Sequence, residues 1–150
     1  MKKTIKKTQK VKETVGQIAE GKIIYFFVDE NHIATNELKT FVFNSKEQKI
    51  EIKTKEFSAV CPFSGLPDIA IIKIDYYPVT NKALELKALK YYFVSFRNVG
   101  IYQEGVTKRI FKDLCDILGH QSIKVSTIYN TRGGIDVICT ENGIKKITQK

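Results

Sequence analysis

The sequence is poor in the patterns that mark disulfide frameworks, metal sites and nucleotide-binding loops. It contains three cysteines, Cys61, Cys115 and Cys139, and no CxxC pair, so neither a disulfide framework nor a zinc knuckle is expected. The two histidines, His32 and His120, have no partner at metal-ligand spacing, and no metal is expected. No Walker sequence and no GxGxxG motif occurs, so a Rossmann-type dinucleotide site is not supported.

Long apolar runs are also missing. None approaches the roughly 20 residues that cross a bilayer, and the basic N-terminus lacks the apolar stretch of a secretory signal. We therefore expect a cytoplasmic protein without membrane contact. The net charge is +9, but lysines are concentrated at the two ends of the chain, so nucleic-acid binding is not expected. The length of 150 residues suits a basic, mobile tail over 1–20 and one domain over 21–150.

What is present is a pattern of strands and two helices. The predicted helices cover 84–96 and 104–118, the second ending at Gly119. The predicted strands cover 23–28, a hairpin within 41–57, 69–77, and a second hairpin, 123–129 with 135–140, joined by NTRGG. Because strands and helices do not alternate, the expected fold class is α+β with an antiparallel sheet.

Apolar spacing also predicts which faces are buried. In the strand 69–77 the cleaner apolar face holds Ala70, Ile72, Ile74 and Tyr76. In the first helix, one face holds Leu86, Leu89 and Phe93.

Residues 58–68, SAVCPFSGLPD, combine one glycine with two prolines and are expected to continue neither a strand nor a helix. In this loop Asp68 follows Cys61 by seven residues, and the turn could return the carboxylate to the thiol. A carboxylate raises the pKa of a neighbouring thiol, so the pair makes sense if the acid donates a proton to whatever the thiol has attacked. The alternative is a turn aspartate beside a packed cysteine.

Three further charged residues allow two interpretations each. Lys87 and Lys90 share a helix face, which suits cofactor phosphates but equally describes a solvated face. Glu104 opens the second helix, where an acid is favourable. It could instead accept paired hydrogen bonds from a guanine-like edge.

Taken in order, these residues resemble the QueF family of nitrile reductases in its short, single-domain form. The resemblance rests on EFSAVCPFSGLPD, on ELKALKYY over 85–92, which meets every position of the family's nicotinamide-cofactor motif, on SFRN over 95–98 and on RGG over 132–134. One departure occurs: the family commonly has His-Glu where this chain has Gln103-Glu104. Glutamine cannot carry a proton near neutral pH, so we expect Asp68 to supply the protons.

The resemblance implies NADPH-dependent reduction of 7-cyano-7-deazaguanine to the 7-aminomethyl compound, in queuosine (tRNA modification) biosynthesis. It assigns Cys61 as the nucleophile that forms a thioimide and Asp68 as the proton donor. Two NADPH are consumed per turnover, and no metal is used. Substrate contacts are implied for Leu84, Glu85, Leu86, Gln103 and Glu104, and cofactor contacts for Lys87, Lys90 and Arg132.

The implied fold is the tunnelling fold, an antiparallel sheet with two helices on one face. Its subunits close into oligomeric barrels with active sites at the interfaces. Three alternatives stay open. They are an amidinotransferase of the same fold acting on deazaguanine-modified tRNA, which the intact ELKALKYY disfavours, a non-catalytic RNA-binding module that uses the lysine-rich tails, and a pterin cyclohydrolase, which the missing zinc ligands disfavour.

Overall fold

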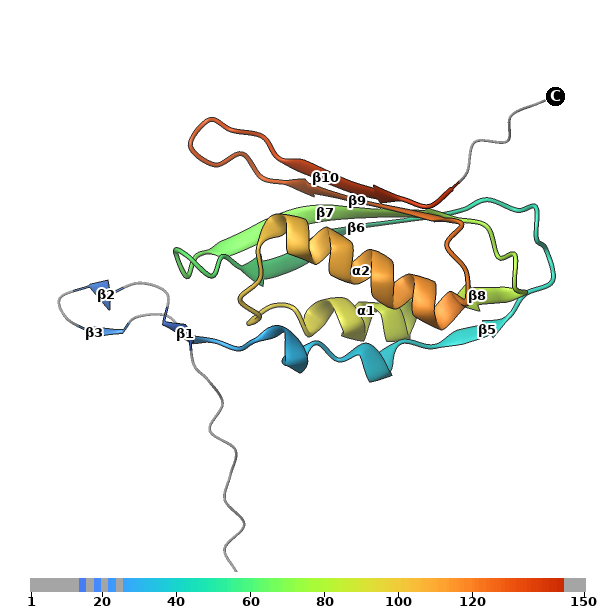
Figure 1. The fold of residues 1–150 in the computed structure, drawn as a ribbon, viewed down its shortest axis with the longest axis horizontal. Coiled ribbons are helices and arrows are strands. Elements are labelled where there is room, and N and C mark those ends of the chain that lie inside the picture. Colours follow the sequence, from blue (N-terminus) through green and yellow to red (C-terminus); the bar gives the residue numbers. More distant parts are fainter. Residues whose placement is uncertain (1–13, 16–17, 20–21, 24–25, 145–150) are drawn as a thin grey trace, which may run out of the picture.

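A computed structural model describes residues 14–15, 18–19, 22–23 and 26–144. Most of the expected basic tail, 1–20, lies outside the described residues. In chain order the elements are β1 (Thr14–Val15), β2 (Ile18–Ala19), β3 (Lys22–Ile23), β4 (Phe26–Phe27), the 3₁₀ turns η1 (Glu30–His32) and η2 (Thr35–Glu37), β5 (Thr40–Val42), β6 (Ile50–Val60), β7 (Pro67–Tyr76), β8 (Lys82–Leu84), α1 (Leu86–Val94), α2 (Gln103–Leu118), β9 (Ile123–Tyr129) and β10 (Ile138–Asn142) (Figure 1).

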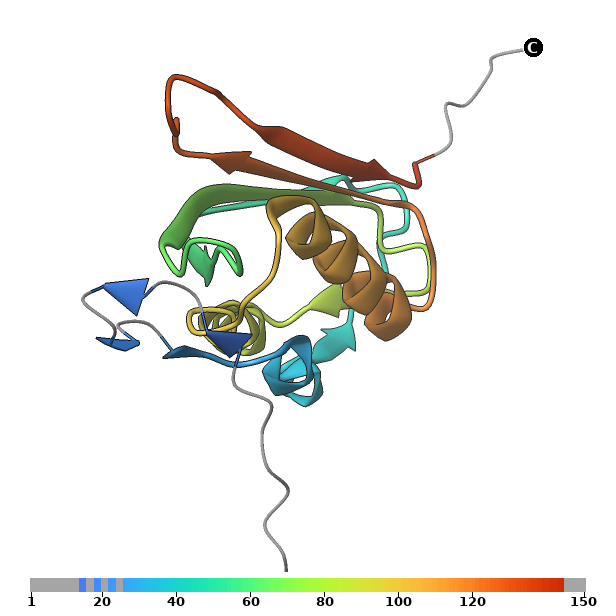
Figure 2. The same cartoon turned by 60° about the vertical axis from the view of Figure 1, so that its left-hand side comes forward.

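A four-stranded antiparallel sheet, in the order β10-β9-β7-β6, forms one layer of the fold. Both helices cover the same face of it, as two views show (Figures 1 and 2). On β7 that face carries the four side chains predicted to be buried, Ala70, Ile72, Ile74 and Tyr76, each 1% exposed. The predicted α+β class with an antiparallel sheet and two helices is therefore confirmed.

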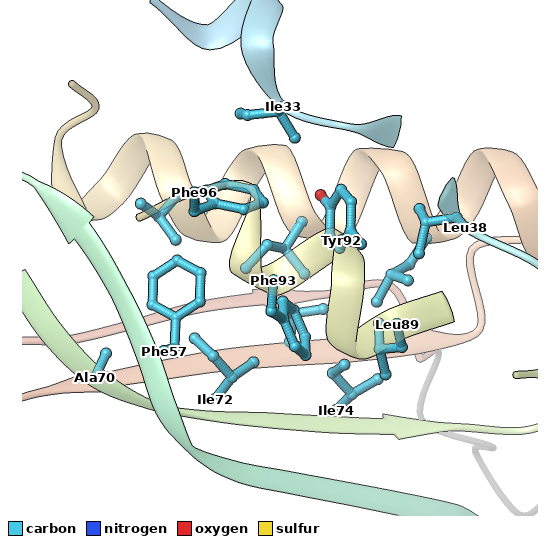
Figure 3. Packing of buried hydrophobic residues seen from close by; sticks show 14 of the residues in the cluster. Ile33, Leu38, Phe57, Ala70, Ile72, Ile74, Leu89, Tyr92, Phe93 and Phe96 are labelled. Atoms are coloured by element: carbon cyan, nitrogen blue, oxygen red, sulfur yellow. The ribbon is translucent and has the colours of Figure 1, made fainter. Parts of the chain in front are cut away.

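An aromatic cluster fixes α1 to the sheet (Figure 3). The rings of Phe57 and Phe96 lie 5.2 Å apart, and those of Tyr92 and Phe96 are also 5.2 Å apart, edge-on. Each such pair contributes about 0.5–1.5 kcal/mol beyond the burial of its area. Phe57 lies near the end of β6, so this cluster also holds the strand that leads into Cys61.

A buried polar network joins the helices to the N-terminal segment. Asp113 of α2, 3% exposed, accepts hydrogen bonds from Tyr92 (2.8 Å), Arg109 (2.7 Å) and Thr35 (3.2 Å). Burial, together with the charge of Asp113, raises the pKa of Tyr92 well above its usual value, so the hydroxyl stays protonated and donates. All three donors bond the same carboxylate oxygen, Oδ2, and such bonds offset the cost of burying the charge.

Three sequence predictions are wrong. The hairpin within 41–57 does not form: β5 pairs with β8, and β6 pairs with β7. The segment 58–68 is a loop only over 61–66, since β6 runs to Val60 and β7 starts at Pro67; proline is tolerated there because it is the first residue of the strand. The first helix was predicted from residue 84 but starts at Leu86, because 82–84 form β8 and Glu85 caps the helix. Leu86, predicted on the buried face, is 62% exposed.

The strand predicted over 23–28 is found only in parts, as β3 and β4, and its other positions are not all described. The remaining predictions hold with small shifts. The strand 69–77 is β7, the second helix is α2 with Gly119 in the left-handed region after it, and the last hairpin is β9 with β10.

The segment 98–101 links the N-terminal part of the chain to the start of α2. It lies between Val28 and Val60 in two parallel bridges, with Gly100 N–H donating to Val28 (2.8 Å) and Ile101 N–H donating to Val60 (3.0 Å). Cys61 follows Val60, and α2 begins two residues after Ile101. This contact therefore sets the relative position of two parts of the candidate site.

Gly100 is the tightest point of this contact. A Cβ there would overlap the buried ring of Phe27, while the backbone of Gly100 is not in the left-handed region. We expect Gly100→Ala to lower the free energy of unfolding by about 1–3 kcal/mol, the usual cost of overpacking. In a Phe27→Ala background the same change should cost much less, because the ring is gone. Urea unfolding of the four variants measures both; an equal cost in both backgrounds would contradict the contact.

Candidate functional site

The Cys61 loop is a short, closed turn between β6 and β7. Cys61 N–H donates to the carbonyl of Leu66 (2.9 Å), and Gly65 N–H donates to the carbonyl of Cys61 (2.8 Å). Gly65 has φ +68°, a conformation that glycine adopts without strain. The two hydrogen bonds fold the prolines and glycine into a rigid loop that leaves Cys61 half-buried.

Asp68 stands in the second position of β7, opposite Ala59 of β6. Its side chain is 3% exposed and forms an ion pair with Arg132. The same carboxylate oxygen accepts a hydrogen bond from the amide of Gln103 at 3.2 Å. Three elements, β7, α2 and the β9–β10 turn, thus meet at one buried carboxylate.

The Cys61 thiol lies in an environment that favours the thiolate. Burial alone raises its pKa, but hydrogen bonds from Ser64, from the backbone of Phe63 and from Arg132 outweigh burial, and the pKa falls below the usual value of a cysteine. A lowered pKa increases the fraction of thiolate, the nucleophilic form, near neutral pH.

A cavity of about 310 Å³ joins these residues, and Cys61, Asp68, Gln103, Glu104 and Arg132 all line it. This volume lies at the lower end of the range for sites of small molecules. A neighbouring cavity of about 230 Å³ is lined by Asp68, Gln103 and Arg132 but not by Cys61. Cys61 and Asp68, seven positions apart in the sequence, thus line the same cavity.

The other predicted site residues lie elsewhere, around the start of α1. Leu84, Glu85 and Leu86 line an apolar cavity of about 460 Å³. The Leu84 side chain is buried, and its N–H donates to Tyr76 (3.0 Å). The Glu85 carboxylate caps α1 by accepting from the backbone of Lys87 (2.9 Å) and Ala88 (2.8 Å), and these hydrogen bonds lower its pKa.

Lys87 and Lys90 stand exposed on successive turns of α1. The ammonium of Lys87 lies 5.9 Å from the ring centre of Tyr91. Lys90 forms an ion pair with Glu56 of β6, in which both side chains are largely solvent-exposed. Figure 1 shows that α1 starts on the side of β8, whereas the β6–β7 loop and the β9–β10 turn lie toward the opposite end of the long axis. One subunit therefore does not bring the two predicted groups together.

Comparison with known proteins agrees with the motifs. Residues 67–147 match the family described as QueF-like protein. A protein of Thermotoga petrophila named NADPH-dependent 7-cyano-7-deazaguanine reductase is 57% identical over 117 residues, which cover 78% of this chain and 85% of the relative. This chain belongs to the QueF family.

A second QueF relative, from Pelodictyon phaeoclathratiforme and of the same name, is 47% identical over 93 residues, 62% of this chain and 79% of its own length. Among solved structures, the apo form of the archaeosine synthase QueF-Like aligns with a TM-score of 0.56 at 20% identity, over 63% of this chain and 93% of the other. That likeness shows the fold alone, and it agrees with the family assignment.

Two contributors to this QueF site were missed in the sequence. Ser64 bonds the Arg132 guanidinium (3.4 Å) and lowers the pKa of Cys61, and Tyr129 donates to the carbonyl of Gln103 (3.2 Å). A serine three residues after a loop cysteine was the available signal for the first. No signal in the sequence marks Tyr129, because its position is that of an ordinary buried strand residue.

Within the described part of the chain, no three His, Cys, Asp or Glu side chains gather as metal ligands. Likewise, no helix among the described residues is long and apolar enough to span a membrane.

Proposed function

We propose that this chain reduces the nitrile of 7-cyano-7-deazaguanine to the 7-aminomethyl compound with NADPH, as a step of queuosine biosynthesis. One observation carries the proposal: Cys61, with its lowered pKa, and the buried carboxylate of Asp68 line one cavity together with Gln103 and Glu104. The names of relatives up to 57% identical support the substrate and the reductant.

In the first step the Cys61 thiolate adds to the nitrile carbon. A carbon–sulfur bond forms, one π bond of the triple bond breaks, and the nitrogen takes up one proton. The thiol loses one proton and the nitrogen gains one, so the step needs no net proton. Asp68 is the group in the cavity placed to pass that proton to the nitrogen.

A thioimide accepts hydride more readily than a nitrile does, which is the reason for covalent catalysis here. NADPH supplies the hydride when bound. After the first hydride the carbon–sulfur bond breaks, Cys61 leaves as the thiolate, and an imine is left. A second hydride gives the amine, so two NADPH and two protons are consumed for each nitrile. Asp68 is placed to deliver each proton.

The purine-like edge of the substrate needs a hydrogen-bond acceptor. Glu104 lines the cavity beside Cys61, and a carboxylate suits two adjacent N–H donors. Gln103 cannot take over proton transfer, but its amide holds Asp68. In this chain Gln103 thus positions the proton donor.

Exposed cations at the start of α1 suit the phosphates of NADPH. Lys87 is exposed, and the ion pair of Lys90 with Glu56 is exposed and hence easily exchanged for a phosphate. Arg132, which the family motif also assigns to the cofactor, is already paired with Asp68. The direct test of the function is NADPH oxidation, followed by its absorbance, when the free nitrile base is added; no oxidation would refute the proposal.

Lys87→Ala should raise the KM for NADPH about tenfold and that for the nitrile much less, because a phosphate contact is worth roughly 1.5–3 kcal/mol. Steady-state kinetics with each substrate varied in turn measures the split. Lys73→Met, which removes an exposed cation from β7, is the control and should leave both constants unchanged. Equal effects of Lys87→Ala on both constants would mean that Lys87 is merely structural.

Two copies of the chain are needed to complete this site. Glu85 caps the start of α1, on the side of β8, and Cys61 lies in the β6–β7 loop, well away from it along the long axis (Figure 1). Large apolar side chains are exposed at both places: Tyr102 and Ile135 line the Cys61 cavity and Phe63 lies in the Cys61 loop, while Phe41 and Leu86 line the cavity beside Glu85. Such patches mark interfaces, and the edge strands β6 and β10 can pair further. We propose the tunnelling fold's barrel assembly, with each active site shared by neighbouring subunits.

Complementation tests the shared site. Glu85→Ser removes the carboxylate but keeps a good helix cap, and Cys61→Ala removes the nucleophile. Each variant alone should be inactive. Co-expressed in equal amounts, they should recover about a quarter of the wild-type rate, because random assembly leaves that share of sites intact. No recovery in a mixed oligomer would contradict sharing.

The proposal further includes a single catalytic domain over 21–150 and a cytoplasmic location, both as expected from the sequence.

A further inference from the structure

Arg132 is held by an unusually well-defined turn. Its N–H and C=O both bond Ile135, at 3.0 Å each, around Gly133 and Gly134 with φ of +57° and +78°. This is the backbone of a two-residue hairpin turn that needs positive φ at both central positions. A Cβ on either glycine would meet nothing within 4 Å, so the glycines serve the turn and not a close contact. The turn fixes the backbone from which the guanidinium projects.

The guanidinium reaches across to the Cys61 loop. It forms the ion pair with Asp68 and a long hydrogen bond to Ser64 (3.4 Å). Its own pKa is raised, chiefly by the charge of Asp68. Among the described residues that line the Cys61 cavity, Arg132 is the only cation, while Asp68 and Glu104 are both acidic.

We infer that Arg132 positions Asp68 and stabilises the Cys61 thiolate, by balancing one negative charge that Cys61 and Asp68 share. This role rests on the proposed function and differs from the cofactor contact that the family motif implies. It would act before NADPH is needed.

The charges of the site explain why such a cation is required. Cys61 lines one cavity with Asp68 of β7, Glu104 of α2 and Tyr102, which precedes α2. Two carboxylates beside a thiol disfavour the thiolate, and an opposite charge within a few ångström favours it. When the shared proton moves from Cys61 to Asp68, the negative charge moves to sulfur; Arg132 pairs with Asp68 and also favours the thiolate of Cys61. When the proton goes on to the nitrile nitrogen, Asp68 becomes the anion and keeps its partner.

Arginine suits this task better than lysine. Its planar fork bonds Asp68 through one nitrogen and Ser64, in the Cys61 loop, through another, whereas an ammonium is a single compact charge. Arg132→Lys should therefore retain part of the stabilisation of the Cys61 thiolate, and Arg132→Met should retain none.

The test measures alkylation of Cys61 by iodoacetamide against pH, without nitrile or NADPH, with the Cys61 peptide quantified by mass spectrometry. We expect Arg132→Met to move the midpoint of the rate profile upward by about one pH unit or more, and to slow alkylation about tenfold at pH 7. Both profiles should converge at high pH, where the thiol is fully ionised. Lys73→Met, an exposed cation on the outer face of β7, should match the wild type.

Arg132→Met leaves the buried Asp68 without its partner, which itself raises the thiol pKa. A second comparison removes this effect: Asp68→Asn against Asp68→Asn with Arg132→Met, where no carboxylate is orphaned. The upward shift should persist between these two. Coinciding profiles in both comparisons would overturn the role of Arg132. Because neither nitrile nor NADPH is present, this result is independent of whether the chain reduces the proposed substrate.

Discussion

Cys61→Ala is expected to abolish nitrile reduction, with a fall in kcat on the order of 10⁴-fold or more. The physical reason is that hydride has no thioimide to reduce once the sulfur is gone, and the nitrile itself is a poor acceptor. Cys61 lies half-buried in a loop, so alanine should leave the fold intact. NADPH oxidation with the nitrile measures the loss, and thermal unfolding confirms that the protein is folded.

The other two cysteines provide matched controls. Cys115 in α2 and Cys139 in β10 are also half-buried, but neither lines the Cys61 cavity. Burial, followed by the charge of Asp116, raises the pKa of Cys115, the opposite of the shift at Cys61. Cys115→Ala and Cys139→Ala should keep near-normal turnover. Activity that survives Cys61→Ala but is lost with either control would assign the nucleophile elsewhere.

Asp68→Asn should lower kcat by on the order of 10²–10⁴-fold while the protein still binds the nitrile, since that is the usual contribution of a positioned acid. Asparagine has the same shape and can still meet Gln103, but it cannot pass a proton. The fold should survive, because the group left unpaired is Arg132, whose side chain is 40% exposed. Single-turnover rates and calorimetric binding of the nitrile separate the two effects.

Loss of binding in parallel with turnover would mean that Asp68 holds the substrate and does not transfer a proton. Near-normal turnover would remove its acid role altogether. A matched control is Asp75→Asn, on the same strand, whose carboxylate faces Lys49 (3.7 Å) and not the cavity. This control should leave both binding and rate unchanged.

Local patterns were sufficient to predict the faces and types of most elements. The alternation in β7 depends on burial of one side of a sheet, which is a local consequence of strand geometry. Pairing is not local. The sequence around Phe41 and Ile50 alternates in both strands of the supposed hairpin, but β5 joins β8, and Thr40 lies opposite Leu84, 44 positions further along. The alternation of apolar residues in a strand does not specify which other strand it pairs with.

In the candidate site, too, local relationships could be predicted and long-range contacts could not. The pairing of Cys61 with Asp68 could be predicted because the two residues lie seven positions apart, on either side of one turn. The ion pair of Asp68 with Arg132 spans 64 positions and depends on the meeting of two hairpins, so it could not be read from either segment alone. The separation of the Glu85 group from the Cys61 group could not be predicted either, because only the fold sets the start of α1 apart from the β6–β7 loop.

The intact-protein mass spectrum of the wild-type chain, mixed with 7-cyano-7-deazaguanine and no reductant, tests the central claim most directly. If Cys61 captures the nitrile, the mass should rise by that of one nitrile molecule per chain, the label should map to the Cys61 peptide, and NADPH should remove it. A spectrum that shows only the unmodified chain, under conditions where the same sample oxidises NADPH, would contradict covalent capture at Cys61.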